Sequence, residues 1–107
     1  MISTITAAVL FDSPGDLIIK EIEVPALEYG QVLVKILYSG VCRSQLMEIK
    51  GLRGEDNWLP HLLGHEASGI VIDKHSSVKK IKVGDNVIAG WIRGEGISAT
   101  PAIYSMN

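Results

Sequence analysis

Hydrophobic positions recur in short runs along the first third of the chain, and their spacing predicts β-strands. The runs cover Ile5–Phe11, Leu17–Val24 and Gln31–Tyr38. The turn-forming residues 12–16 separate the first two runs and predict a hairpin. The third run alternates regularly, with valine, isoleucine and tyrosine on one face. We therefore expect the third run to be a central strand.

In the middle of the chain, the spacing of apolar residues becomes helical over one segment and then returns to the spacing of strands. Residues Arg43–Lys50 carry apolar side chains at helical spacing and are followed by a glycine, which predicts one short helix. Residues 51–60 are typical of an exposed loop. Further β segments are expected at Gly64–Lys74, Val78–Ile81 and Asn86–Trp91, with a turn at 83–85. Residues 93–107 show no clear period, so the predicted fold class is mainly β.

The length and composition of the chain predict one soluble domain. The chain has 107 residues, 47% of them hydrophobic, which suffices for one packed core. A net charge of −2 provides no basic surface, so we expect no nucleic-acid partner. No apolar run approaches the ~20 residues of a membrane helix, and we expect no membrane partner. A single Cys and the absence of a leader at Met1 favour a cytoplasmic location.

Cys42 is the first candidate for chemistry. A lone Cys is often a small buried hydrophobe, but this one lies between a predicted strand and a predicted helix, beside Arg43. Such surroundings favour a thiolate, which either binds zinc or attacks carbon. A thiol enzyme with a His base would also need an oxyanion-hole motif, and we find none.

Two histidines offer metal ligands of different quality. His61 and His65 are four residues apart and would share one face of a helix, but the proline and glycine in this segment argue against a helix. His65 is followed by Glu66 at the entry to a strand, where the carboxylate could bind a metal or orient a ligand. His65 and Glu66 could equally be hydrogen-bonded polar residues on a strand, with no role in metal binding. Trp58 and Trp91 either pack in the core or line a pocket.

Three segments together resemble the zinc-dependent alcohol dehydrogenases of the medium-chain dehydrogenase/reductase family. They are residues 39–44 (SGVCRS), 60–69 (PHLLGHEASG) and 83–87 (VGDNV), in the family's order and spacing. The resemblance covers almost the whole chain. It implies a GroES-like, partly open β-barrel with one or two short helices. Residues 1–107 would form the N-terminal portion of the catalytic domain, with the nucleotide-binding Rossmann domain absent from this chain.

The resemblance also implies residue roles. Cys42 and His65 would bind the catalytic zinc, and Glu66 would be an outer or occasional direct ligand. Ser44 would relay the proton of the substrate alcohol, and Arg43 would contact the cofactor pyrophosphate. Zinc lowers the pKa of a bound alcohol and so prepares it to give hydride to NAD or NADP. The implied substrate is a small alcohol or its carbonyl product, and the full-length protein is expected to be a homo-oligomer.

The chain departs from the family pattern in three ways. Gln45 stands where the family commonly has Asp, so the zinc-bound His would lack that charge. The four-Cys structural zinc lobe is absent, because the chain has one Cys. No Gly-x-Gly-x-x-Gly fingerprint is present. We therefore expect the third zinc ligand and the nicotinamide site beyond Asn107, and we expect residues 1–107 alone neither to bind NAD(H) nor to catalyse a reaction.

A metal-free co-chaperonin or binding module is the alternative function. The co-chaperonin that caps the chaperonin ring has a similar length and β-barrel, and it shares the Val-Gly-Asp-x-Val turn. A lid subunit has no use for Cys42 and the Gly-His-Glu motif at this spacing, and these residues favour the dehydrogenase.

Overall fold

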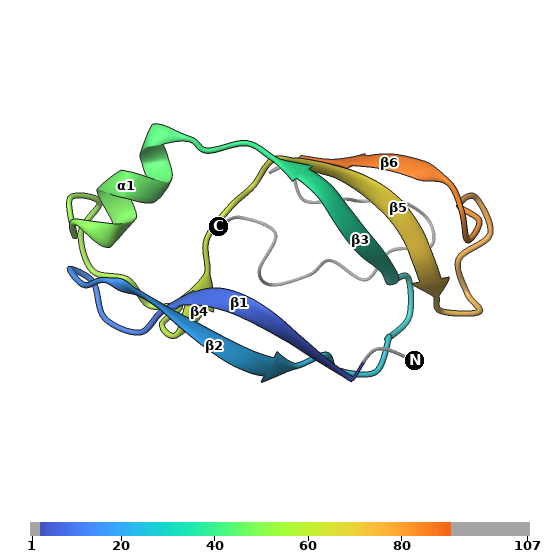
Figure 1. Cartoon of the computed structure of the whole chain (residues 1–107), viewed down its shortest axis with the longest axis horizontal. Coiled ribbons are helices and arrows are strands. Elements are labelled where there is room, and N and C mark those ends of the chain that lie inside the picture. Colours follow the sequence, from blue (N-terminus) through green and yellow to red (C-terminus); the bar gives the residue numbers. More distant parts are fainter. Residues whose placement is uncertain (1–2, 91–107) are drawn as a thin grey trace. The chain divides into compact units, whose positions relative to one another are not determined.

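A computed structural model describes residues 3–90, which contain six strands and one short helix (Figure 1). The chain divides into two compact units, Met1–Pro25 with Val41–Gly64 and Ala26–Gly40 with His65–Asn107. Among the described residues, no helix has the length and apolar character needed to span a membrane. The elements are β1 (Thr4–Leu10), β2 (Leu17–Glu23), β3 (Val32–Ser39), α1 (Arg43–Ile49), β4 (His61–Leu62), β5 (Ala67–Lys74) and β6 (Asn86–Ala89).

The first unit is built on an antiparallel sheet with the order β2-β1-β4. The predicted hairpin is confirmed, because β1 and β2 pair from Thr4 opposite Glu23 to Leu10 opposite Leu17. The two-residue strand β4 adds to the other edge of β1, with His61 opposite Leu10. Leu10 is fully buried, so the core of this unit lies where β4 meets the end of β1.

The turn between β1 and β2 closes the C-terminal end of α1. Ser13 donates its hydroxyl to the carbonyl of Glu48 at 2.6 Å, and the Gly15 N–H donates to the carbonyl of Ile49 at 2.9 Å. The last carbonyls of a helix have no partner within the helix, so these bonds satisfy two of them. Gly51 then turns the chain away with φ +69°, and a Cβ there would lie 3.0 Å from Cδ of Pro14.

Gly51→Ala is expected to destabilise the chain more than Gly54→Ala. Both glycines have positive φ, which costs an L-residue roughly 1–2 kcal/mol, but a Cβ at Gly54 would meet nothing within 4 Å. The alanine at 51 must also displace Pro14, so we expect its loss of unfolding free energy to be larger by about 1 kcal/mol. Urea unfolding followed by circular dichroism measures both variants. Equal losses would show that the contact with Pro14 is unimportant.

The second unit contains an antiparallel sheet with the order β3-β5-β6. The prediction that β3 is a central strand is wrong for the described residues, where β3 is an edge and β5 is central. β5 runs beside β3 from Ala67 opposite Ser39 to Lys74 opposite Val32, and beside β6 on its other side. Strand order depends on the pairing partners, and the alternation within β3 carries no information about them.

Small and apolar residues of β5 make this arrangement possible. Gly69 lies opposite Ile36, and a Cβ there would collide with the backbone carbonyl of Lys35. Val71 is fully buried. The predicted strand Val78–Ile81 is absent, because Val78 is buried in a turn in which its N–H donates to the carbonyl of His75 at 3.0 Å.

The predicted fold class is confirmed: the described chain is mainly β, with one short helix and two small sheets, neither of which closes on itself. Trp91 and the segment 93–107 lie outside the described residues.

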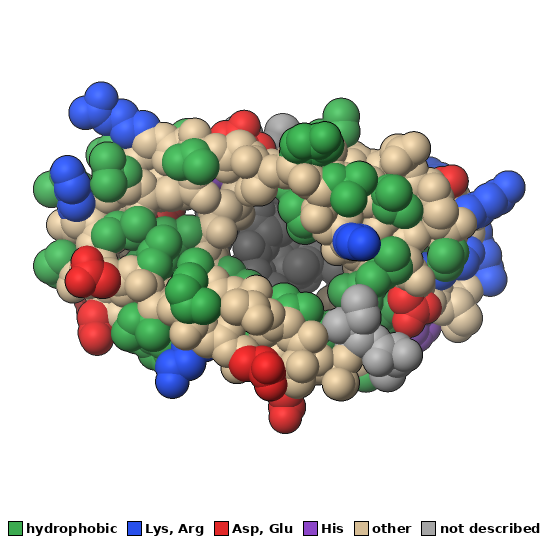
Figure 2. All heavy atoms as spheres, viewed as in Figure 1, with side chains coloured by type: hydrophobic (Ala, Val, Ile, Leu, Met, Phe, Trp, Pro, Cys, Tyr) green, Lys and Arg blue, Asp and Glu red, His purple; other side chains and the backbone are tan. Residues whose placement is uncertain are grey.

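Figure 2 shows apolar side chains at the surface, in green. They include large side chains on strands of both units, such as Ile19 on β2, Tyr38 on β3 and Ile88 on β6.

Candidate functional site

Cys42 is the N-cap residue immediately before α1, in the first unit. Its backbone is extended, with φ −108° and ψ 147°, and its side chain is half-buried. Gln45 forms a local bridge here: its side-chain oxygen accepts the Cys42 N–H at 2.7 Å, while its own N–H donates to the Cys42 carbonyl at 3.1 Å. The helix start therefore fixes the backbone on which the thiol is carried.

Gln45 also lies against the glycine that precedes the Gly-His-Glu histidine. A Cβ on Gly64 would lie 3.2 Å from Nε2 of Gln45, and Gly64 has φ +117°, a conformation that suits glycine. The amide oxygen thus caps the start of the helix, while the amide nitrogen occupies the space beside Gly64. Sequence reasoning identified Gln45 only as a missing charge and did not foresee this capping role.

Arg43 and Ser44 are the first two residues of α1 and lie beside Cys42. The Arg43 side chain is exposed, and Ser44 is half-buried. The start of the helix therefore brings together the predicted thiol, hydroxyl and guanidinium groups.

His65 and Glu66 lie in the second unit, immediately before β5. The His65 side chain is 18% exposed and that of Glu66 is 53% exposed. Their Nε2 and Oε1 atoms are 3.9 Å apart, close enough for an electrostatic contact but too far for a hydrogen bond. The backbone carbonyl of Glu66 accepts the N–H of Gly40 at 3.0 Å, and the absence of a Cβ on Gly40 leaves room for the Glu66 side chain. The end of β3 thus positions Glu66.

His61 differs from the other candidates because it is buried, with 8% of the residue exposed. It lies in β4 and not in a helix, which confirms that the His61–His65 spacing is not a helical metal pair. Its Nε2 lies 2.7 Å from Oδ2 of Asp56, in the preceding loop. Sequence reasoning missed this pair, although an Asp two residues before Trp58 is a turn signal, and Oδ1 of Asp56 does accept the Trp58 N–H at 2.9 Å.

The pKa of Asp56 lies below its ordinary value. Burial on its own raises that pKa, but the hydrogen bonds from His61 and from the Trp58 N–H, together with the charge of His61, outweigh burial. Asp56 is therefore held as a carboxylate against the buried imidazole.

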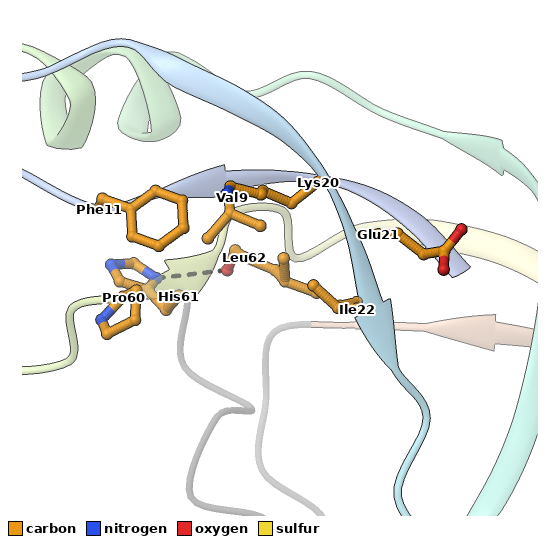
Figure 3. A pocket seen from close by; sticks show the side chains of 8 residues that line it. All are labelled: Val9, Phe11, Lys20, Glu21, Ile22, Pro60, His61 and Leu62. Carbon is orange, nitrogen blue, oxygen red and sulfur yellow. Dashed lines mark hydrogen bonds between the residues drawn. The ribbon is translucent and has the colours of Figure 1, made fainter. Parts of the chain in front are cut away.

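A pocket of about 370 Å³ lies in the first unit, over strands β1, β2 and β4. Figure 3 shows Phe11 and Pro60 close to the His61 ring, on one side of the pocket. None of the residues predicted to bind zinc, substrate or cofactor lines it, and Trp58, which is exposed, does not line it either. The lining residues are Val9, Phe11, Lys20, Glu21, Ile22, Pro60, His61 and Leu62.

Comparisons with known proteins agree with the motifs. Residues 28–103 match the family described as alcohol dehydrogenase GroES-like domain. The chain is 45% identical over 86 residues to an alcohol dehydrogenase of Geobacillus stearothermophilus, covering 80% of this chain and 25% of that protein. It is 40% identical over 89 residues to an alcohol dehydrogenase class-3 of Dictyostelium discoideum, covering 83% of this chain and 23% of that protein.

A solved structure shares the fold. The crystal structure of CAD from Helicobacter pylori complexed with NADP(H) superimposes with a TM-score of 0.72 and 27% identity. The match covers 83% of this chain and 25% of that chain. The chain thus spans about a quarter of the length of the relatives that it matches.

Proposed function

The chain belongs to the alcohol dehydrogenase GroES-like domain family of the medium-chain dehydrogenases/reductases, and from this membership we propose that it supplies zinc ligands to an oxidoreductase that transfers hydride between an alcohol and a nicotinamide cofactor. One observation carries the proposal. The matched residues 28–103 contain both Cys42, at the start of α1, and the His65–Glu66 pair, at the entry to β5.

The donor set fits zinc. A thiolate and an imidazole are the two ligand types that zinc prefers, and a carboxylate oxygen is its third common ligand. Cys42 and His65 are both half-buried, and Glu66 is the more exposed of the three. We propose Cys42 and His65 as ligands and Glu66 as an outer or occasional third one. Zinc, when bound, acts as a Lewis acid that lowers the pKa of an alcohol hydroxyl.

Ser44 and Arg43 would act on the substrate and cofactor. The Ser44 hydroxyl, two residues after Cys42, would accept a hydrogen bond from the alcohol and relay its proton, passing its own hydroxyl proton on to solvent. Arg43 has an exposed guanidinium, which suits charge-assisted hydrogen bonds to a pyrophosphate. Gln45 would contribute by holding the backbone of Cys42, since a neutral amide adds no negative charge near the histidine.

The remaining parts of the enzyme are also proposals. No dinucleotide-binding fingerprint occurs within the 107 residues, so we propose that other sequence binds the cofactor, either NAD or NADP. The exposed apolar strands support contact with further polypeptide, either that sequence or another subunit of a homo-oligomer. A single Cys is compatible with the proposed cytoplasmic location. A small alcohol or carbonyl compound is the proposed substrate.

Metal analysis of the protein expressed from the complete reading frame tests this function. We expect at least one zinc per subunit after dialysis. When Co²⁺ replaces zinc, we expect a thiolate-to-cobalt absorption band that is lost in Cys42→Ala, because the proposed site binds the ion through the Cys42 thiolate. A protein without zinc that forms a stable heptameric ring would contradict the proposal and favour the co-chaperonin.

A further inference from the structure

Three side chains from separate segments of the first unit, none of them a proposed zinc ligand, meet in one cluster. They are Glu48 near the end of α1, Asp56 in the following loop and His61 in β4. One ligand atom of each lies within 4.8 Å of the other two. Atoms that bind one ion at 2.0–2.2 Å lie about 3–4 Å apart, so a shift of roughly 1 Å would bring all three onto one ion.

All three side chains are largely shielded from solvent. Their exposed fractions are 15% for Glu48, 11% for Asp56 and 6% for His61. His61 is the one buried polar or charged residue among those described, and the side chains that share the buried class with it are aliphatic. Two carboxylates and an imidazole are costly to hold together out of water unless a cation or hydrogen bonds compensate them.

The orientation of His61 suits a metal ligand. Its Nε2 faces Asp56, and its Nδ1 lies 3.3 Å from the backbone carbonyl of Leu62. Histidines that bind metals through one ring nitrogen usually donate the other N–H to a carbonyl or carboxylate, which fixes the ring and its tautomer. The Leu62 carbonyl is placed to accept such a bond, leaving Nε2 to the ion.

From these observations we infer that Glu48, Asp56 and His61 form a second metal site, for a divalent transition-metal ion such as Zn²⁺ or Mn²⁺. An imidazole nitrogen disfavours Mg²⁺ and Ca²⁺, which prefer all-oxygen sites, and the two carboxylates supply the negative charge. A bound ion would join the end of α1, the 51–60 loop and β4. The site uses neither Cys42 nor His65, so it does not depend on the proposed function.

Arg53 competes with the metal for one ligand. Its Nη1 lies 3.2 Å from Oε1 of Glu48, but its side chain is 54% exposed and free to swing into solvent. An exposed ion pair of this kind contributes little to stability, so releasing it costs little. Removing Arg53 is therefore expected to leave metal affinity unchanged or to increase it.

Cobalt titration of the 107-residue chain carrying Cys42→Ala and His65→Gln tests the site without the proposed zinc ligands. We expect one equivalent of Co²⁺ to bind, with visible d–d bands. Loss of a residue that only hydrogen-bonds a metal ligand weakens metal binding about 10–100-fold. Glu48 and Asp56 would bind the ion directly, so Glu48→Gln and Asp56→Asn should each raise the Kd for Co²⁺ by about 100-fold or more. The matched control Glu55→Gln removes an exposed neighbouring charge and should leave Kd unchanged. Arg53→Gln should leave Kd unchanged or lower it.

Two results would overturn the inference. One is no saturable Co²⁺ binding in the chain that lacks Cys42 and His65. The other is a Kd that changes no more in Glu48→Gln and Asp56→Asn than in Glu55→Gln. If the double variant does not fold, the same titration with Cys42 and His65 intact decides the matter. Glu48→Gln must then remove one equivalent of Co²⁺ without altering the thiolate-to-cobalt band, which reports Cys42 alone.

Discussion

Cys42→Ala is expected to remove the zinc proposed to bind Cys42, and enzymatic turnover with it, from the protein expressed from the complete reading frame. Without the Cys42 thiolate, His65 and the exposed Glu66 would form a poor site. Lewis-acid catalysis contributes several kcal/mol, and each 1.36 kcal/mol is tenfold in rate. We therefore expect kcat/KM to fall by about 10³-fold or more.

Zinc content and alcohol oxidation, measured on the same preparations, check this result. Ser44→Ala is the matched comparison, because Ser44 lies two residues after Cys42 and is not a proposed zinc ligand. It should keep its zinc and lose about 10²–10⁴-fold in kcat, the usual contribution of a proton-transfer group. Zinc-dependent turnover that survives in Cys42→Ala would remove Cys42 from the ligand set.

Gly69→Ala is expected to cost the chain a large part of its stability. A Cβ at this position in β5 would collide with the carbonyl of Lys35 and lie 2.8 Å from Cγ1 of Val34. The obstacle is partly backbone, so β3 must move away from β5 along their shared ladder. Overpacking of this kind costs about 3 kcal/mol or more, against a total of about 5–15 kcal/mol for a domain.

Urea unfolding of Gly69→Ala beside Gly40→Ala separates a backbone collision from a side-chain one. A Cβ on Gly40 would lie 2.6 Å from Cδ of Glu66, which is an exposed and flexible side chain that can rotate away. We expect Gly40→Ala to change the unfolding free energy by no more than about 1 kcal/mol. Similar losses in the two variants would show that β3 tolerates a side chain at position 69.

The strand pattern was readable from sequence because β-branched and other apolar residues recur in runs that turn-forming residues separate. The hairpin, β3, α1 and β5 all lie within two or three residues of their predicted bounds. β4 was missed because two residues cannot show a period, and His61 and Leu62 are held there by pairing with β1. Val78–Ile81 was wrongly predicted as a strand because Val78 is buried in a turn, and burial in a turn leaves the same apolar signal as burial in a strand.

The candidate zinc ligands were predictable because their motifs are local. Cys42 with Ser44, and His65 with Glu66, each occupy a few consecutive residues. The Asp56–His61 pair depends on the path of the 51–60 loop, and Glu48 joins it only because α1 ends nearby. No spacing rule joins residues that meet through a loop without a regular period, so this cluster became visible only in the folded chain.

The two hydrogen bonds that close α1 make the folding of the helix dependent on the hairpin. A helix of seven residues is far shorter than the ~12–15 residues needed for even marginal stability in water. The bond from Ser13 to Glu48 spans 35 residues of sequence, so it forms only after the hairpin has docked. Local fraying and refolding of α1 are then coupled to the hairpin, and the two should exchange amide protons as one cooperative group. The order of the segment that carries the thiol thus depends on a serine bound at the opposite end of the helix.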